Sequence, residues 1–65
     1  MKAIKQKDGY YLYKIDGHHE LWRGKHGSEY GFNAGYVADP ANFEYAVDVA
    51  KEEAAALMAE FEMYG

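Results

Sequence analysis

Apolar and polar residues alternate along the N-terminal third of the chain, a pattern that is typical of β-strands with one buried face. Two Asp-Gly pairs interrupt the alternation, at Asp8-Gly9 and Asp16-Gly17. Asp-Gly favours the two-residue type I′ turn of a β-hairpin, because both turn positions need a positive φ. The sequence therefore predicts a three-stranded antiparallel β-meander with strands over residues 2–7, 10–15 and 18–23.

The two faces of this predicted sheet carry different side chains, because successive residues of a strand point to opposite sides. One face holds mostly aromatic and aliphatic residues: Ile4, Tyr11, Tyr13, Ile15 and Trp22, with His18 and Glu20 toward one end. The other face holds basic residues around a few apolar ones: Lys5, Lys14, His19 and Arg23 around Tyr10, Leu12 and Leu21. We expect the aromatic face to form the core and the basic face to contact solvent.

Residues 30–38 alternate again between larger and smaller side chains. Gly31 and Gly35 lie within this segment, and glycine weakens a strand because it has no side chain to pack. Two structures are compatible with this pattern: a fourth, irregular edge strand, or an ordered loop that crosses the sheet.

A long helix is predicted to follow. Asp39 supplies a capping carboxylate and Pro40 suits the first helical position, so the helix begins there. It extends to about residue 63 and would be roughly 36 Å long. An apolar stripe is expected to face the sheet: Phe43, Val47, Ala50, Ala54, Leu57 and Phe61, with Ala46 and Met58 alongside. The predicted fold class is therefore α+β, an antiparallel β-meander packed against one long C-terminal α-helix.

A second apolar stripe lies on the helix, far from the first one. Tyr45, Val49, Ala56 and Met63 fall close together on the helix surface, and the acids that border them are Glu52, Glu53 and Glu60. Scattered apolar surface residues are normal, and side chains packed beneath residues 24–38 are a second alternative. A contact surface for a partner, or for a second copy of the chain, is the third, because interfaces commonly place apolar anchors within a charged rim.

The chain has 65 residues and no cysteine, which indicates one small domain without disulfides or thiolate metal ligands. Residues 1–38 would form the meander and loop, and residues 39–65 the acidic helix. Aromatic residues make up 17% of the chain, and they suit half-buried strand positions or a partner surface. No apolar run reaches the length of about 20 residues that crosses a membrane, and no apolar signal segment follows Met1. We therefore expect a cytoplasmic protein with no membrane contact.

Charge is divided unevenly along the chain. Residues 39–65 contain seven acids and one base, a net charge of −6, whereas residues 1–38 contain six bases and four acids, a net charge of +2. A field of this size selects partners of opposite charge. We expect a monomer rather than a homodimer, one that binds a cationic surface of a protein or nucleoprotein complex. Direct nucleic-acid binding is not expected, since the helix would repel phosphate and would cover the aromatic face.

The sequence contains few residues suited to catalysis or metal binding. The only cluster of metal-ligand types is His18, His19, Glu20 and His26. His18 and His19 point to opposite faces of a strand, and His19 with His26 would capture zinc only adventitiously. Ser28 is the only serine and has no nucleophile-elbow context, and the glycines match neither a dinucleotide-binding nor a phosphate-loop pattern. We expect no enzyme activity, no metal site and no cofactor.

Two resemblances to known families add to this picture. Asp8-Gly9-Tyr10-Tyr11, followed by the alanine- and glutamate-rich run 46–54, resembles the antitoxin subunit of HicA–HicB toxin–antitoxin pairs, although the Pro-Asp-Leu-Pro-Gly-Cys segment of that family is absent. Small size, acidity and lack of cysteine over the whole chain resemble the phage-encoded anti-CRISPR proteins. The second resemblance implies an inhibitor that imitates nucleic acid or plugs a nucleic-acid channel, in the host cytoplasm if the chain is phage-encoded.

The expected function is inhibitory protein binding. The acidic helix with its apolar anchors would block a positively charged, nucleic-acid-binding surface of a larger complex such as a CRISPR effector. The alternative, implied by the first resemblance, is a HicB-like antitoxin that neutralises a basic toxin ribonuclease. The candidate partner-binding residues are Glu44, Tyr45, Asp48, Val49, Glu52, Glu53, Glu60 and Met63.

Overall fold

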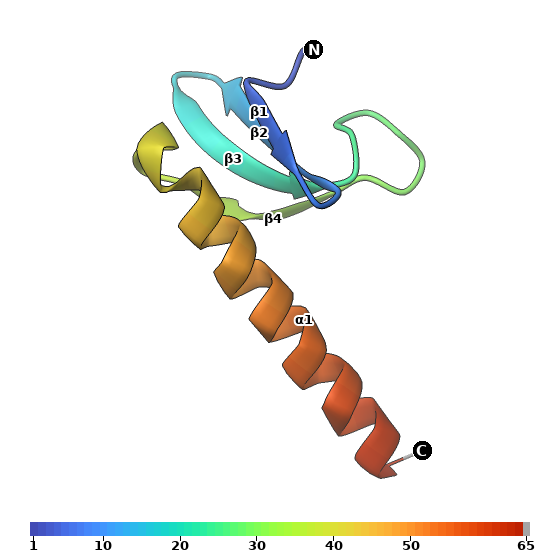
Figure 1. Ribbon diagram of the computed structural model, residues 1–65. Coiled ribbons are helices and arrows are strands. Elements are labelled where there is room, and N and C mark those ends of the chain that lie inside the picture. Colours follow the sequence, from blue (N-terminus) through green and yellow to red (C-terminus); the bar gives the residue numbers. More distant parts are fainter. Residues whose placement is uncertain (65) are drawn as a thin grey trace.

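A computed structural model describes residues 1–64, with side chains through Glu62. Four antiparallel strands form one sheet in chain order, β1-β2-β3-β4. Their bounds are β1 Lys5–Lys7, β2 Tyr10–Ile15, β3 His18–Arg23 and β4 Phe32–Tyr36. A 3₁₀ turn, η1 (Pro40–Asn42), leads into one long helix, α1 (Phe43–Tyr64), which packs on one face of the sheet (Figure 1). The predicted α+β class is confirmed.

The two Asp-Gly pairs form the turns that the sequence predicts. Asp8 and Gly9 have φ values of 52° and 82°, and Asp16 and Gly17 have φ values of 50° and 82°. Positive φ at both positions is the property that a type I′ turn requires, and this turn matches the twist of the flanking strands. Two-residue turns fix the strand register, and β2 pairs with β3 without a shift from Tyr10 opposite Arg23 to Ile15 opposite His18.

β4 lies at one edge of the sheet and runs antiparallel to β3. The pairing shifts between Leu21 and Trp22, a β-bulge that makes this strand irregular. Beyond the strand, the Val37 N–H donates to the His19 carbonyl at 3.0 Å and continues the ladder. Of the two structures compatible with residues 30–38, the irregular edge strand is therefore the one observed.

The connection into α1 begins with the predicted cap. Asp39 Oδ1 accepts a hydrogen bond from the Ala41 N–H at 3.0 Å, and Pro40 occupies the first turn. This turn is 3₁₀, with the Asn42 N–H donating to the Asp39 carbonyl at 2.9 Å, before the α-helix starts at Phe43. The cap satisfies a backbone N–H group that has no partner within the helix.

The core lies on the face of the sheet that we expected to contact solvent. Six buried apolar residues pack together there: Tyr10, Leu12, Leu21, Val37, Phe43 and Val47. α1 covers this face, and Lys5 of β1 donates to the Pro40 carbonyl. The expected assignment of the two faces is wrong for a physical reason. Leu12 and Leu21 have no polar group and need a dry environment, whereas Trp22 has an N–H that finds a partner, Glu20, on the opposite face.

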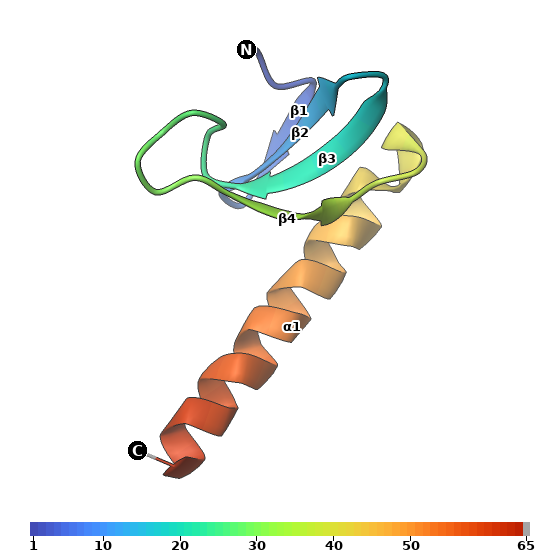
Figure 2. The same ribbon diagram turned by 180° about the vertical axis from the view of Figure 1, so that it is seen from behind.

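Only the N-terminal half of α1 packs on the sheet. Every described side chain from residue 51 to residue 62 is exposed, and the molecule measures 40 Å along its longest axis but 18 Å along its shortest. Figure 2 shows the helix passing the β4 edge and continuing beyond the sheet. Three residues expected in the core, Ala54, Leu57 and Phe61, and the flanking Met58, are therefore on the surface. Within residues 1–64, no helix is long and apolar enough to cross a membrane.

Candidate functional site

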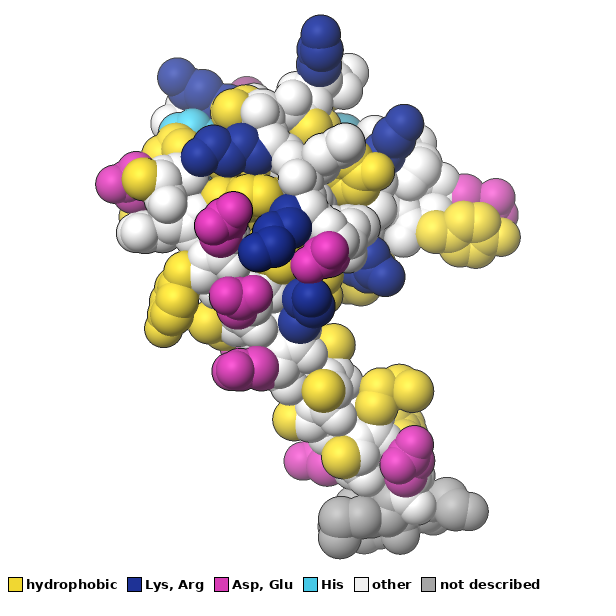
Figure 3. All heavy atoms as spheres, in the orientation of Figure 1, with side chains coloured by type: hydrophobic (Ala, Val, Ile, Leu, Met, Phe, Trp, Pro, Cys, Tyr) yellow, Lys and Arg dark blue, Asp and Glu magenta, His cyan; other side chains and the backbone are white. Residues whose placement is uncertain are grey.

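The outward face of α1 is the side turned away from the sheet. A helix turns by about 100° per residue, so Tyr45 and Glu52 point away from the side on which Val47 is buried. Tyr45 is 72% exposed and stands among acids of the first turns, Glu44 and Asp48, which are also exposed. Figure 3 shows acidic side chains spaced along the length of α1. Through Glu62, the outward face is therefore an acidic surface on which Tyr45 is the large aromatic side chain.

Lys51, the one base of residues 39–65, is held beside the sheet. Its Nζ donates to Asp8 Oδ2 at 2.9 Å. This hydrogen bond and the charge of Lys51 lower the pKa of Asp8 below its ordinary value, and Asp8 raises the pKa of Lys51. Both side chains are about half exposed, so the pair adds little stability. The pair holds the charge of Lys51 against the sheet. Residues 52–62 contain four acids and no base, so every charged side chain of this projection is acidic.

Three large apolar side chains also lie on this projection. Leu57, Met58 and Phe61 are 58%, 63% and 75% exposed, and we call them the projecting stripe. They continue the line of the buried Phe43 and Val47, because residues spaced by three, four and seven share one side of a helix. The projecting stripe thus lies on the side of α1 that packs on the sheet. It lies beyond the β4 edge, where this chain has no strand for it to pack against.

A groove of about 270 Å³ lies between β4 and α1. Its lining is mostly apolar and includes Ala34, Val37, Ala46, Val49 and Ala50, together with Tyr36, Tyr45 and Glu53. The predicted partner-binding residues Tyr45, Val49 and Glu53 therefore share one groove, at the border of the outward face.

The other predicted partner-binding residues are spread around the helix. The exposed ones are Glu44, Asp48, Glu52 and Glu60. Glu44 borders a different groove, which Lys5 and Lys7 of β1 also line. The Met63 side chain lies outside the described residues. The predicted residues thus form an acidic surface that wraps α1 and not one compact site.

Sequence reasoning missed the projecting stripe, because it assigned Leu57 and Phe61 to the core. The lengths of the predicted strands and of the predicted helix could have shown that these residues lie outside the core. β2 and β3 have six residues each, and a strand of that length spans about 20 Å. The predicted helix spans roughly 36 Å. A large part of the helix must therefore extend beyond the sheet.

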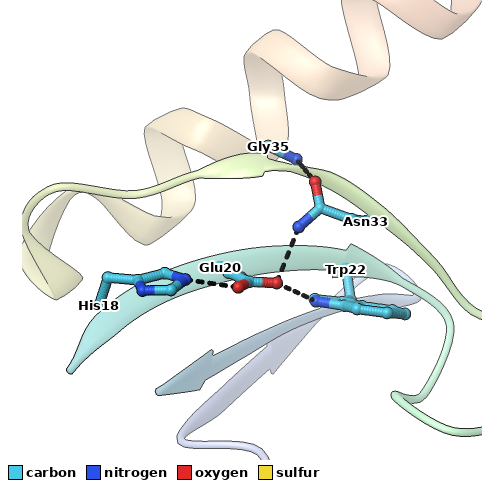
Figure 4. A network of polar contacts seen from close by, with 5 residues as sticks. All are labelled: His18, Glu20, Trp22, Asn33 and Gly35. Carbon is cyan, nitrogen blue, oxygen red and sulfur yellow. Dashed lines mark hydrogen bonds and ion pairs between the residues drawn. The ribbon is translucent and has the colours of Figure 1, made fainter. Parts of the chain in front are cut away.

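The open face of the sheet carries a polar network centred on Glu20 (Figure 4). Glu20 Oε1 accepts hydrogen bonds from Trp22 Nε1 at 3.1 Å and from Asn33 Nδ2 at 2.9 Å, and Oε2 accepts one from His18 Nε2. Asn33 Oδ1 accepts a hydrogen bond from the Gly35 N–H at 2.8 Å. The hydrogen bonds from His18 and then from Trp22 lower the pKa of Glu20 below its ordinary value. The network joins β3 to β4 and fixes the orientation of the indole ring.

Aromatic rings pack beside this network. The His26 ring centroid lies 4.4 Å from that of Trp22 and 5.6 Å from that of Tyr13, and the His26 N–H donates to the Tyr13 hydroxyl at 3.0 Å. The loop between β3 and β4 thus covers Tyr13, which is buried. α1 does not cover this open face of the sheet. The helix therefore does not prevent nucleic-acid bases from stacking on the aromatic rings of this face. The predicted absence of nucleic-acid binding now rests on charge alone.

The histidines do not gather into one site. His26 packs on the open face, whereas His19 lies on the opposite face with Leu21. The structure therefore separates the two histidines that we considered as an adventitious zinc site. Among the described residues, no group of three or more His, Asp or Glu side chains is placed to hold a metal ion.

Comparisons with known proteins add no functional clue. No protein family, curated protein or solved structure matches the chain. Function is therefore inferred from two surfaces of the molecule. One is the acidic outward face of α1, and the other is the apolar region formed by the projecting stripe and the β4 edge.

Proposed function

We propose that the chain is a small inhibitory protein that binds a positively charged surface of a larger protein complex through the outward face of α1. The observation that carries the proposal is the exposure of Tyr45 among the acids of a helix whose single base is paired with Asp8. Acids steer a cationic partner and fix its orientation, and a central aromatic anchor supplies contact energy. Surfaces rich in Lys and Arg are typical of proteins that bind nucleic acid.

Inhibition would follow from occupation of such a surface. Glu53 and Glu60 are seven residues apart, about 10 Å along a helix axis. Duplex DNA presents about one negative charge per 1.7 Å, so the acids of α1 are too sparse to imitate a duplex. A helix that lies in a basic groove would instead exclude nucleic acid by its volume, with its acids pairing with some of the basic side chains. The resemblance to anti-CRISPR proteins makes a CRISPR effector one such complex.

Site-specific photo-crosslinking tests this proposal. A benzophenone amino acid in place of Tyr45 should crosslink a partner in cells of the source organism. The matched control is the same substitution at Tyr30, which is 84% exposed on the loop between β3 and β4 and should not crosslink that partner. The variant with Glu44, Asp48 and Glu52 changed to Lys should lose the crosslink while keeping its circular dichroism spectrum. Equal crosslinking from both positions, or a crosslink that survives the charge reversal, would contradict the proposal.

A further inference from the structure

The projecting stripe faces a region that one more strand beside β4 would occupy. Leu57, Met58 and Phe61 lie on the side of α1 that carries the buried Val47, and that side faces the sheet. Figures 1 and 2 both show α1 passing β4 and extending beyond that edge. A sheet extended past β4 would therefore supply the surface that the stripe lacks.

The β4 edge is open to such an extension. Residues 30–38 contain no charged residue and no proline. Natural proteins protect free edges with charges, proline, bulges or covering segments, because an exposed edge is a template for another strand. The bulge is the one such device in β4 itself. β1, at the other edge, has three residues, of which Lys5 and Lys7 are charged. The two edges thus differ, and β4 is the one suited to pairing.

The backbone of β4 has groups directed to that edge. The Val37 N–H donates to the His19 carbonyl, so Val37 directs its N–H toward β3. Tyr36 lies opposite Glu20 in the adjacent pair. Hydrogen-bonded and non-hydrogen-bonded pairs alternate in an antiparallel ladder, so the N–H and C=O of Tyr36 point away from β3. They are positioned to pair with a further strand.

We infer that β4 pairs with β4 of a second copy of the chain, antiparallel about a two-fold axis perpendicular to the sheet. Such a contact is self-complementary, as a two-fold interface requires. The axis keeps both helices on one face of the joined sheet, where the stripe of each copy can fill the groove between β4 and α1 of the other. This dimer replaces the monomer that we expected from the sequence.

Charge favours a second copy as the occupant. Each chain carries a net charge of −4, so two copies repel over much of their surface. Residues 30–38 and the stripe residues Leu57, Met58 and Phe61 carry no charge, so Glu53 is the one acid of the groove that this contact approaches. A cationic partner would find nothing to pair with on this edge. The outward face of α1, with Glu44, Asp48 and Glu52, stays free in the dimer.

The size of the chain gives a second reason for a partner copy. The described residues include seven buried apolar side chains, a small core for a domain without disulfides, and oligomerisation is a common supplement in such cases. A helical segment of fewer than about 12–15 residues is marginal in water without tertiary packing. Residues 51–62 have exposed side chains throughout in the single chain, and the dimer would supply that packing.

Sedimentation equilibrium of the intact chain over a range of concentrations tests the inference. We expect a dimer that dissociates on dilution, and a Tyr36 amide that exchanges slowly with deuterium only in the dimer. Tyr36→Pro removes the N–H that points to the edge and should raise the dimer dissociation constant at least about tenfold. Tyr36→Ala keeps that N–H and is the matched control, with a smaller effect. Leu57→Ser with Phe61→Ser should weaken the dimer as Tyr36→Pro does.

A chain that stays monomeric at all concentrations would overturn the inference, and so would a dimer that Tyr36→Pro leaves unchanged. If Tyr36→Pro does not fold, Tyr36→Lys places a charge on the edge and serves the same purpose, because Tyr36 is 76% exposed. Failure of the dimer is separable from failure of the proposed function. Reversal of Glu44, Asp48 and Glu52 should leave Tyr36 protection intact. Substitutions of Tyr36 should leave the Tyr45 crosslink to the cationic partner in place. Tyr45 also lines the groove, so a crosslink between two copies of the chain belongs to the dimer, is recognised by its mass, and should be lost in Tyr36→Pro.

Discussion

Gly9 and Gly17 adopt the same φ of 82° in the two β-turns but differ in the space that a side chain would have. A Cβ atom on Gly9 would collide with the Arg23 guanidinium, so a substitution there would combine steric and conformational effects. A Cβ atom on Gly17 would meet no heavy atom within 4 Å. Gly17 has a φ of 82°, a conformation that side chains with a Cβ rarely adopt. Gly17 is therefore the position at which the backbone requirement of the turn can be measured alone.

Gly17→Val should destabilise the domain by about 1–2 kcal/mol, because a β-branched residue is strained at positive φ. Gly17→Asn is the matched control and should cost clearly less, since asparagine tolerates the left-handed region. Urea unfolding, followed by circular dichroism, gives both values. Equal free energies of unfolding for wild type and Gly17→Val would mean that the second turn is not the type I′ turn described here.

Glu20 is the residue on which the open face depends. Its carboxylate accepts hydrogen bonds from His18, Trp22 and Asn33, and these hold its pKa below the ordinary value of 4.5. A carboxyl group whose pKa is lower in the folded state contributes stability above its unfolded pKa. That contribution is lost as the pH falls through the folded pKa.

Glu20→Gln should lower the melting temperature at neutral pH, because the amide loses the charge that strengthens the three hydrogen bonds. The difference between wild type and variant should shrink once the pH falls below about 4.5, where the unfolded carboxyl is protonated. Trp22 is the single tryptophan and reports the same event. Its fluorescence should titrate below that pH in the wild type only, and identical titrations in both proteins would show that the indole does not bond to Glu20.

At the scale of elements, local sequence determines most of what was predictable. The Asp-Gly turns set the β2–β3 register, and Asp39 with Pro40 starts the helix, because each depends on a few neighbouring residues. The face that α1 covers depends on packing between distant segments, and both faces of the sheet carry apolar residues. Leu12 and Leu21 were better indicators of the core than the aromatic side chains, which carry their own polar groups.

Part of the candidate site could also be predicted from the sequence, and part of it could not. Acidic residues of the outward face, such as Glu52, could be placed from helix periodicity, because a surface residue needs no partner to be exposed. The position of Leu57 and Phe61 could not be read from periodicity, which gives the side of a helix and not the extent of the surface opposite it. The pairing of Lys51 with Asp8 also joins residues far apart in the sequence.

Two substitutions on α1 test which side is buried. Val47 is fully buried, and Val47→Ala should cost about 2 kcal/mol through lost apolar contacts and the cavity that remains. Tyr45 is two residues away on the outward face, and Tyr45→Ala should change the free energy of unfolding by less than about 0.5 kcal/mol. Chemical denaturation of both variants provides the comparison. A large loss in Tyr45→Ala would assign that ring to the core and remove it from the partner surface.

At the scale of the whole molecule, the chain separates its charge in space as well as in sequence. Lys5 and Lys7 lie in the sheet, whereas the four acids of residues 52–62 lie on α1 at the β4 edge and beyond it. At physiological ionic strength a charge is screened over about 8 Å, so the projecting acids act as a local field and not as part of a uniform net charge. Association with a cationic partner should therefore depend on where a charge lies.

Comparing Glu52→Lys with Glu29→Lys tests whether binding depends on the position of a charge or only on the net charge of the chain. Both residues are exposed, and each substitution changes the net charge from −4 to −2, but Glu52 lies on the outward face of α1 and Glu29 on the loop between β3 and β4. The association rate with the partner crosslinked through Tyr45, measured by stopped flow at several salt concentrations, should fall severalfold for Glu52→Lys at low salt. It should change little for Glu29→Lys, and the difference should narrow as salt is added, because screening weakens steering. Equal rates for the two variants at every salt concentration would show that the partner responds to net charge and that the outward face has no special role in binding.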